Sequence, residues 1–193
     1  DTMCVFEGPQ GIGKSRALQI IGGDWFTEQH ENAQNARAFA EILQGKLLVE
    51  ISEMDSFQRA ELTSVKRTIT CQSDRFRPPY ARHAADFPRR CIFAGTTNTT
   101  DWNRDSTGAR RFWPIACDGQ IDHAGLSASR DQLFAEAAHH FRTGSTWWQM
   151  PETETLQEQA SRYQVDPWAE AIENWLESYP RTEFTASDVF TTC

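Results

Sequence analysis

The sequence predicts an α/β fold in three layers, with a mostly parallel sheet between helices. Three apolar runs carry this prediction: Met3–Phe6, Lys46–Glu53 and Arg90–Asn98. Strands of a parallel sheet are covered by helices on both faces, so they read as nearly continuous aliphatic runs. A glycine-rich loop and a helical segment follow the first run, which is the order of a strand–loop–helix unit.

The loop after the first run fits the phosphate-loop pattern G-x-x-x-x-G-K-[ST] at all four fixed positions, which are Gly8, Gly13, Lys14 and Ser15. Glycines allow backbone angles that are closed to other residues, so successive amides can surround a phosphate. Lys14 is expected to reach the β- and γ-phosphates of a nucleotide, and Ser15 to ligate Mg²⁺. A helix over Ser15–Ile21 would point its positive end at the same anion. The alternative is a chance glycine-rich turn. The expected nucleotide-binding residues are Gly8, Gln10, Gly11, Gly13, Lys14, Ser15 and Arg16.

Composition agrees with one domain that carries a small appendage. The chain has 193 residues, of which 39% are hydrophobic, and no run approaches the length of a membrane span. Five cysteines without C-x-x-C spacing argue against zinc and against a disulfide framework, and they indicate a reducing, cytoplasmic compartment. The net charge is −8, yet Ser64–Cys91 carries +5 and Pro151–Cys193 carries −7. The middle segment is therefore basic although the net charge of the whole chain is negative.

Two carboxylates mark the second apolar run. Before it, Gly22–Phe26 predicts a turn and the alanine-rich stretch Asn32–Leu43 predicts a helix. The run itself holds Glu50 and ends at Glu53, and the carboxyl end of a parallel strand is where α/β sheets bind ligands. Both are candidates for holding Mg²⁺ and for orienting the attacking water, with Glu53 the stronger candidate for catalysis. The alternative is a solvated strand end.

The basic segment follows a helix predicted over Met54–Thr70, whose apolar stripe is expected to face the core. Two prolines exclude a helix from Cys71–Arg82, where arginines are interleaved with aromatic residues. Arginines two positions apart on an extended segment suit phosphate contact, while aromatic rings stack on bases. Equally, Arg75 and Arg77 can pair with carboxylates of the fold or of a neighbouring subunit. The candidate DNA-binding residues are Lys66, Arg67, Arg75, Arg77, Tyr80 and Arg82.

The third run ends at Asn98, whose amide both donates and accepts hydrogen bonds. Beside a phosphate loop such a side chain suits a sensor of the γ-phosphate or its water, and a β-turn cap is the alternative. Arg110 and Arg111 follow, and adjacent side chains on an extended segment face opposite ways. One can pair structurally while the other reaches a phosphate as an arginine finger, within the subunit or across a subunit boundary. Phe112–Ile115 predicts a fourth strand.

The last part of the chain predicts helices. Ser129–Arg142 has an apolar face, and the acidic stretch Glu152–Gln164 predicts a helix or a linker. Pro167 opens an amphipathic helix, and Phe184–Phe190 has the pattern of a capped start to another. The expected organisation is a core at residues 1–150, a linker or acidic helix at 151–166, and from 167 to 193 the first part of a small helical module, with a winged helix as one alternative.

Five blocks in order resemble the virulence-associated protein E family, which comprises P-loop ATPases of phages and mobile elements within the AAA+ group. This family is related to superfamily 3 helicases and phage-type primase-helicases. The blocks are Gly8–Ser15, Leu47–Asp55, Asp74–Arg82, Phe87–Asn98 and Thr107–Ile115. The resemblance implies an ATPase core working as a ring, such as a hexamer, with ATP between subunits, Asn98 as sensor 1 and Arg110 or Arg111 as the finger. It also matches Lys66–Arg82 with the DNA-contacting hairpin region of superfamily 3 proteins. The Walker-B spacing departs from the usual pattern, which leaves the division of labour between Glu50 and Glu53 open.

Together these features predict a Mg²⁺-dependent ATPase that acts on DNA as a replicative helicase of a phage or mobile element. ATP and Mg²⁺ are the expected cofactors, DNA and further copies of the chain are the expected partners, and no membrane is involved. A nucleotide-gated interaction or phage-interference protein without unwinding activity is the alternative. A small-molecule kinase with a similar loop is a third class, but it has no use for Asn98 or for the arginine pair.

Overall fold

A computed structural model describes residues 2–29, 36–103, 109–146, 148–163 and 168–178, together with residues 183, 185, 186 and 189. The chain divides into two compact units, Asp1–Tyr163 and Gln164–Cys193. The second unit contains helix α6 (Ala169–Ser178), in which Trp175 is buried. Most of the predicted helix start at 184–190 lies outside the described residues, as do residues 30–35 and 104–108.

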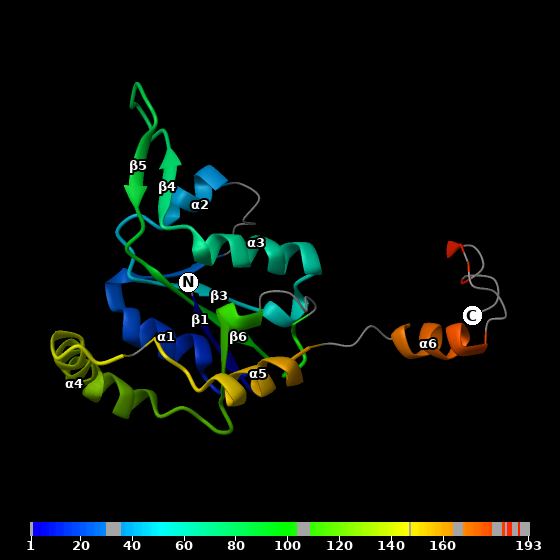
Figure 1. The fold of residues 1–193 in the computed structure, drawn as a ribbon. Helices are drawn as coiled ribbons and strands as arrows, with labels where there is room; N and C mark the ends of the chain where they lie inside the picture. The colour runs from blue at the N-terminus through cyan, green and yellow to red at the C-terminus, as the bar shows by residue number, and fades with distance from the viewer. Residues whose placement is uncertain are drawn as a thin grey trace. The chain divides into compact units, whose positions relative to one another are not determined.

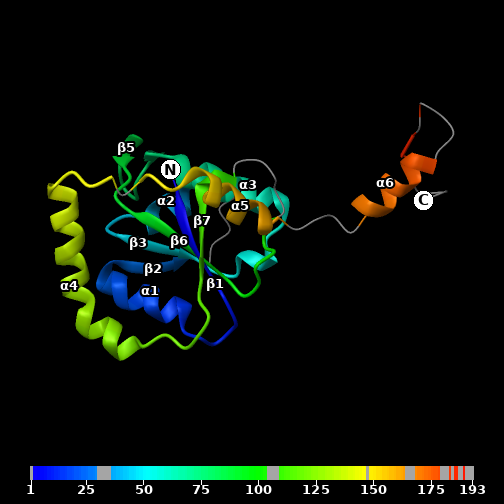
Figure 2. The same ribbon diagram turned by 60° about the horizontal axis from the view of Figure 1, so that its bottom comes forward.

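The first unit is built on a five-stranded sheet in the order β2-β3-β6-β1-β7, and every pairing in it is parallel (Figure 1). Helix α1 lies on one face of the sheet, and α2 and α3 lie on the other (Figure 2). The predicted α/β class with a mostly parallel sheet is therefore confirmed. The strands are β1 (Met3–Glu7), β2 (Phe26–Gln29), β3 (Leu48–Ile51), β6 (Ile92–Thr97) and β7 (Phe112–Ala116).

Alternation along the strands assigns residues to the two faces, because successive side chains of a strand point to opposite sides. Val49 and Phe93 join the large core cluster under α2 and α3, whereas Leu48 and Ala94 pack with Leu18 of α1. The same parity places Glu50 and Thr96 on the α1 face and Glu7 on the opposite one. The helices of this unit are α1 (Lys14–Gly22), α2 (Ala36–Ile42), α3 (Arg59–Thr70), α4 (His123–Arg142) and α5 (Glu152–Ser161).

Strand β2 occupies the end of the segment that the sequence predicts as a turn, and it extends to Gln29. A 3₁₀ turn at Gly23–Trp25 precedes it, and Phe26–Gln29 pairs with Leu48–Ile51 at the edge of the sheet. The strand has only four residues, two of which are the poor strand formers Glu28 and Gln29, so its local sequence signal is weak. The predicted turn is thus confirmed at Gly23–Trp25, and the strand that follows it was not predicted because it depends on pairing with β3.

The predicted helix over Met54–Thr70 begins late. Its first residues form a separate 3₁₀ turn, Met54–Ser56, and α3 starts only at Arg59. Gln58 and Glu61 form a capping box at this start, in which the Gln58 amide donates to Glu61 Oε2 at 2.7 Å. The apolar stripe of α3 is buried as predicted, and each such aliphatic side chain stabilises the fold by about 1.5–3 kcal/mol.

A β-hairpin forms within the basic segment. Strands β4 (Ser73–Phe76) and β5 (Ala85–Pro88) pair antiparallel and project beyond α2 and α3 (Figure 1). The Phe76 and Phe87 rings stack with their centroids 4.5 Å apart. At the base of the hairpin a buried ion pair joins Arg89 to Asp74. The hairpin therefore has its own small core and a fixed attachment to the first unit.

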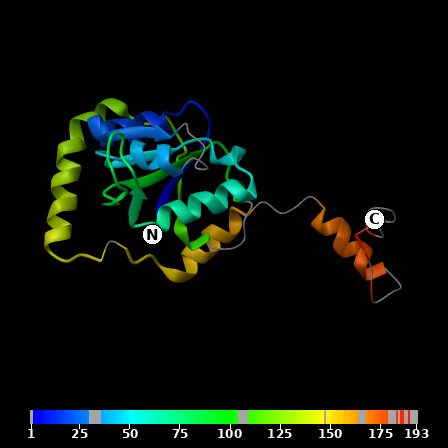
Figure 3. The same cartoon turned by 90° about the horizontal axis from the view of Figure 1, so that it is seen from above.

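Helix α4 begins six residues before the predicted start, at His123, because Asp122 caps it by accepting from the Gly125 amide at 2.9 Å. The helix lies at the outside of the first unit in Figure 3, beside α1, where Arg130 Nε donates to the Ile21 carbonyl at 2.9 Å. Its predicted apolar face is largely open to solvent, and Phe141 is 74% exposed. Within the described residues, no helix combines the length and apolar character needed to span a bilayer.

Helix α5 occupies the acidic stretch for which the sequence allows a helix or a linker. It packs against β7, where Gln159 Nε2 donates to the Phe112 carbonyl at 3.0 Å. Arg162, just after the helix, pairs with the buried carboxylate of Glu7 on β1. These contacts attach α5 to the sheet, and the first unit extends accordingly to Tyr163.

Candidate functional site

A cleft of about 290 Å³ lies at the carboxyl ends of the three inner strands of the sheet, which are β3, β6 and β1. Strands β1, β3 and β6 are neighbours and parallel, so the segments that follow them meet at one edge. The cleft is lined by parts of the glycine-rich loop, by the turn after β3 and by the end of β6. Its lining residues are Gln10, Gly11, Gly13, Lys14, Ser15, Arg16, Glu28, Ser52, Glu53, Thr96, Thr97 and Asn98.

The loop needs glycine at Gly8 and Gly13 for steric as well as conformational reasons. A Cβ on Gly8 would lie 2.3 Å from the Cys117 carbonyl oxygen, and one on Gly13 would lie 2.3 Å from the His123 ring. Gly13 also has a φ of 98°, in the left-handed region that favours glycine. His123 accordingly approaches the loop closely, with its Nε2 3.1 Å from the Gly13 carbonyl oxygen.

Lys14 lies inside the loop, with 7% of its surface exposed. Its Nζ donates to the carbonyls of Gly8 and Pro9, at 2.5 Å and 3.0 Å, and to Asn98 Oδ1 at 3.3 Å. Burial lowers the pKa of Lys14 from its ordinary value, and the nearby Cys117, Asp55 and Glu50 act in the opposite sense. The ammonium therefore connects the loop to the end of β6 and is held among neutral carbonyl oxygens.

Glu50 connects three elements of the site. Its side chain is fully buried, and its Oε1 accepts from Ser15 Oγ at 2.6 Å and from Thr96 Oγ1 at 2.8 Å. Ser15 belongs to α1 and Thr96 to β6, so one carboxylate oxygen holds both elements to β3. Ser15 and one of Glu50 and Glu53 were expected to hold Mg²⁺ together, whereas Thr96 was not predicted. Its sequence signal is its position two residues after Ala94, which places both side chains on the α1 face of β6.

Glu53 has a different environment from Glu50. It is exposed, and its φ of 54° reverses the backbone two residues after β3 ends. Asn98 is also exposed, and the segment around it is fixed by Asp55, whose Oδ1 accepts from the Asn98 amide and from Thr97 Oγ1, each at 3.3 Å. Neither Asp55 nor Glu28 was predicted from the sequence as part of the site, and Glu28 lines the cleft from the unpredicted strand β2.

Arg110 and Arg111 lie away from the cleft. They belong to a 3₁₀ turn, Ala109–Arg111, rather than to the predicted extended segment, because the chain turns directly before β7. In the parallel pairing of β1 with β7, Met3 lies beside Phe112 and Glu7 lies beside Ala116. The arginines, which come just before Phe112, therefore lie at the amino ends of these strands, whereas the glycine-rich loop lies at the carboxyl end of β1. The intervening strand spans roughly 13 Å. The structure therefore does not bring either arginine into the cleft of its own chain.

The candidate DNA-binding residues separate into an exposed group and one buried residue. Lys66 is 6% exposed, and its ammonium lies 5.7 Å from the centroid of the Phe112 ring. Helical spacing explains this, because Lys66 shares a face of α3 with Leu62 and Ile69. Its assignment to a DNA-binding surface is therefore wrong for the folded chain. The exposed group comprises Arg67 on α3 and Arg75, Arg77, Tyr80 and Arg82 on the hairpin.

For Arg75 the sequence left two alternatives, contact with phosphate or pairing with a carboxylate, and the structure shows the second. It forms an exposed ion pair across the hairpin with Asp86 at 2.8 Å, and exposed pairs of this kind contribute little to stability. Tyr80 stands fully exposed at the tip with a φ of 64°, between the two other arginines of the hairpin. Arg77, Tyr80 and Arg82, here called the hairpin tip, are thus the most accessible part of the basic segment.

Within the described ranges, no three His, Cys, Asp or Glu side chains gather closely enough to form a metal cage. The Ser15 hydroxyl and the Glu50 carboxylate nevertheless form an oxygen pair of the kind that Mg²⁺ accepts. Mg²⁺ usually keeps several waters and needs only one or two protein carboxylates together with substrate phosphates. The donor set at the loop therefore fits Mg²⁺ bound with a phosphate ligand better than a metal held by protein alone.

The fold and cleft together define an α/β protein with a glycine-rich loop at the carboxyl edge of a five-stranded parallel sheet. The model of the virulence-associated protein E-like domain matches residues 1–166, and the chain belongs to this family. The resemblance to the family is thereby confirmed.

Solved structures with a similar arrangement include apo structures of the NrS-1 C-terminal region, residues 305–718. One shares 18% identity with this chain at a TM-score of 0.47, covering 94% of this chain and 43% of its own. A second, called the A form, also has 18% identity with a TM-score of 0.44 over 94% and 42%. This chain thus spans less than half the length of these structures. No curated protein matches it.

Proposed function

We propose that this chain is a Mg²⁺-dependent ATPase that acts on DNA, as a helicase in the replication of a phage or mobile element. The observation that carries the proposal is the 2.6 Å hydrogen bond from Ser15 Oγ to the buried Glu50, directly after a loop of P-loop pattern. A hydroxyl and a carboxylate of this kind are the groups that hold the nucleotide-bound cation in P-loop enzymes, which supports the proposal. Membership of the virulence-associated protein E-like family supports a phage-type replication role.

In this proposal the loop amides and Lys14 bind the phosphates. The ammonium exchanges its bonds to the Gly8 and Pro9 carbonyls for phosphate oxygens, and an anionic partner reverses the burial effect that lowers its pKa. Bound Mg²⁺ would neutralise charge that develops on the phosphates. Ser15 and Glu50 hold that ion, and Asn98 orients the attacking water with help from Asp55. Glu53, exposed at the rim, is then the candidate base.

The position of the arginine pair supports an assembly of several copies. Arg110 and Arg111 precede β7 at the edge opposite to the loop, so neither serves the cleft of its own chain. A neighbouring copy packed head to tail would present them to that cleft as fingers in trans. Repeated head-to-tail contacts close into a ring when the rotation permits, and we propose such a ring, with six subunits as the expected number.

The first test is the substitution Lys14→Ala. It removes the only ammonium that the described residues place in the loop, so ATP hydrolysis should fall to background while the fold, measured by circular dichroism, is retained. Release of phosphate is measured with and without single-stranded DNA, and stimulation of the wild type by DNA supports the helicase proposal. Wild-type turnover in the Lys14→Ala protein would overturn the site assignment.

One observation favours the alternative of a nucleotide-gated interaction protein. Neither Arg110 nor Arg111 reaches the cleft of its own chain, so a single chain lacks the proposed finger and can bind ATP without hydrolysing it efficiently. The same assay separates the two functions: tight nucleotide binding without turnover, at protein concentrations where copies assemble and DNA is present, would favour the alternative. Particle size measured with ATP and DNA establishes whether those copies assemble.

A further inference from the structure

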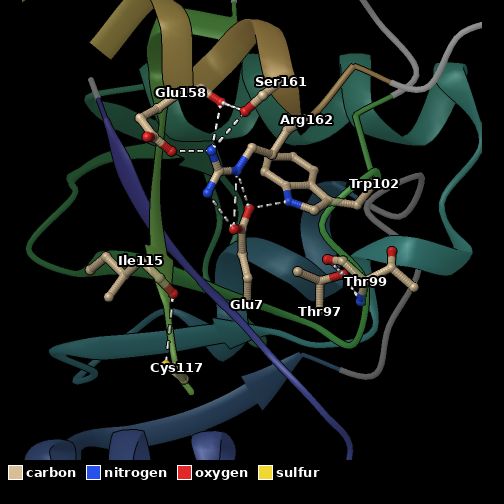
Figure 4. A network of polar contacts seen from close by, with 9 residues as sticks. All are labelled: Glu7, Thr97, Thr99, Trp102, Ile115, Cys117, Glu158, Ser161 and Arg162. Carbon is tan, nitrogen blue, oxygen red and sulfur yellow. Dashed lines mark hydrogen bonds and ion pairs between the residues drawn. The ribbon is translucent and has the colours of Figure 1, made fainter. Parts of the chain in front are cut away.

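Glu7 is a buried carboxylate that the proposed chemistry does not use. It is the last residue of β1, directly before Gly8, and it is 1% exposed. Arg162 binds it through two nitrogen atoms, with Nε 3.1 Å from both carboxylate oxygens and Nη2 2.9 Å from Oε2, and Trp102 Nε1 donates to Oε1 at 2.7 Å (Figure 4). A buried charge is tolerated only when it is paired and hydrogen-bonded, and here every carboxylate oxygen has a charged partner.

This ion pair lies where three parts of the proposed site are anchored. Trp102 comes four residues after Asn98, and its ring meets that of Phe112 edge-on with centroids 5.2 Å apart. Phe112 directly follows the arginine pair, and its carbonyl accepts from Gln159 of α5. The Arg162 carbonyl in turn accepts from the Asn103 amide at 3.0 Å. The end of α5 is thus tied to the loop, to the segment after Asn98 and to the start of β7.

The connection from Glu7 into the loop is short. The Cys117 amide donates to the Glu7 carbonyl at 2.7 Å, and the Cys117 carbonyl lies against Gly8. Gly8 in turn accepts the 2.5 Å hydrogen bond from Lys14 Nζ. The Glu7 side chain points to the face opposite to Glu50 and Ser15, so it cannot touch a ligand in the cleft. Any effect on that ligand is exerted by placing the loop.

We infer that Glu7 and Arg162 are positioning residues for the nucleotide site: their ion pair fixes the glycine-rich loop relative to the Asn98 segment and the start of β7. This inference rests on the proposed function for its consequences in catalysis. The hydrogen bond to Glu7 also raises the pKa of Arg162.

The test compares Arg162→Lys with Arg89→Lys. Lysine keeps the charge but loses the two-pronged geometry of the guanidinium. Arg89 with Asp74 is a matched control, because it is a second buried arginine–carboxylate pair that lies at the hairpin base and outside the proposed site. Both variants should lose stability to a similar extent, measured by chemical denaturation.

Only Arg162→Lys should also disturb the loop. We expect hydrogen exchange in a peptide covering Val5–Ser15 to accelerate, and affinity for a fluorescent ATP analogue to fall, by about tenfold each, the size expected for loss of one charge-assisted hydrogen bond. Trp102→Phe, which keeps the ring but removes its donor, should shift both readouts in the same direction by less. If Arg162→Lys fails to fold, the Trp102→Phe variant alone tests the inference.

Loop exchange and affinity that respond equally to Arg162→Lys and Arg89→Lys would overturn the inference, as would a Trp102→Phe protein with wild-type values. Exchange is measured without nucleotide, so the two proposals fail separately. A wild-type protein that neither binds nor hydrolyses ATP sinks the proposed function and leaves the exchange comparison intact.

Discussion

Two glutamates three residues apart occupy very different surroundings. Glu50 is buried on β3 and bonded to Ser15 and Thr96, whereas Glu53 is exposed after a left-handed backbone turn. Residues other than glycine in that conformation cost of order 1–3 kcal/mol and are concentrated at functional sites. The turn at Glu53 carries its carboxylate away from the sheet and towards the rim of the cleft. The surroundings favour Glu50 as the metal carboxylate and Glu53 as the base.

This division predicts different kinetics for two conservative changes. Glu53→Gln should lower kcat by about 10²–10⁴-fold with ATP affinity nearly unchanged, because it removes a base and little else. Glu50→Gln should raise the Mg²⁺ concentration needed for half-maximal activity. Steady-state hydrolysis over a Mg²⁺ titration measures both effects. Glu41→Gln, which removes a half-exposed carboxylate paired with Arg37 on α2, is the control. A reversal of the two patterns would exchange the assignments.

At the scale of elements, side chains of neighbouring elements pack closely against β6 at Gly95. A Cβ there would lie 2.4 Å from Met54 Sδ, 3.1 Å from Met3 Cε and 3.3 Å from Val5 Cγ2. Gly95→Ala should therefore lower the free energy of unfolding by about 1–3 kcal/mol, the usual cost of overpacking. Chemical denaturation measures the loss. Gly119→Ala, which meets nothing within 4 Å, should change stability by less than about 0.5 kcal/mol.

The β4–β5 hairpin is the element expected to contact DNA. The double change Arg77→Ala with Arg82→Ala removes two exposed cations from the hairpin tip, so the slope of log affinity against log salt for single-stranded DNA should fall by roughly 1.4. Tyr80→Ala should weaken binding through lost stacking. Fluorescence anisotropy over a salt series provides the measurement. Arg142→Ala, an exposed arginine on α4, should leave the slope unchanged, and an equal effect there would contradict a specific role for the hairpin.

The sequence predicts elements well where their signal is local. The loop pattern and the aliphatic runs of β1, β3 and β6 suffice to locate these strands. Strand β2 is missed because its four residues depend on pairing with β3, and the burial of Lys66 is missed because it depends on Phe112 from another strand. Glu7 and Arg162 are 155 positions apart, so no spacing rule links them.

For the whole molecule, the cleft and the arginine pair lie at opposite ends of the strands of one sheet. This arrangement predicts that two inactive variants, one changed in the loop and one in the arginine pair, complement each other. Lys14→Ala subunits keep Arg110 and Arg111, while a chain with both arginines changed to Ala keeps its cleft. An equal mixture should recover about a quarter of wild-type activity, because a head-to-tail contact pairs an intact cleft with intact arginines in that fraction of cases. Phosphate release after subunit exchange measures it.

The matched control mixes Lys14→Ala with a chain that carries all three changes. No intact cleft is then present, so no activity should return. Absence of recovery in the first mixture, with subunit exchange verified by labelled chains, would contradict fingers that act in trans.

The register of β7 against β1 has one more consequence, which concerns how activity depends on assembly size. Because the cleft lies beyond the end of β1 and the arginines lie before the start of β7, each chain would have, on the proposed mechanism, one end that donates the finger and one end that accepts it. An open row of such chains always leaves one cleft without its neighbour, whereas a closed ring leaves none. On the proposed mechanism, turnover per chain therefore rises with each subunit added to a row and reaches its full value only on closure, so completing the circle is itself an activating event.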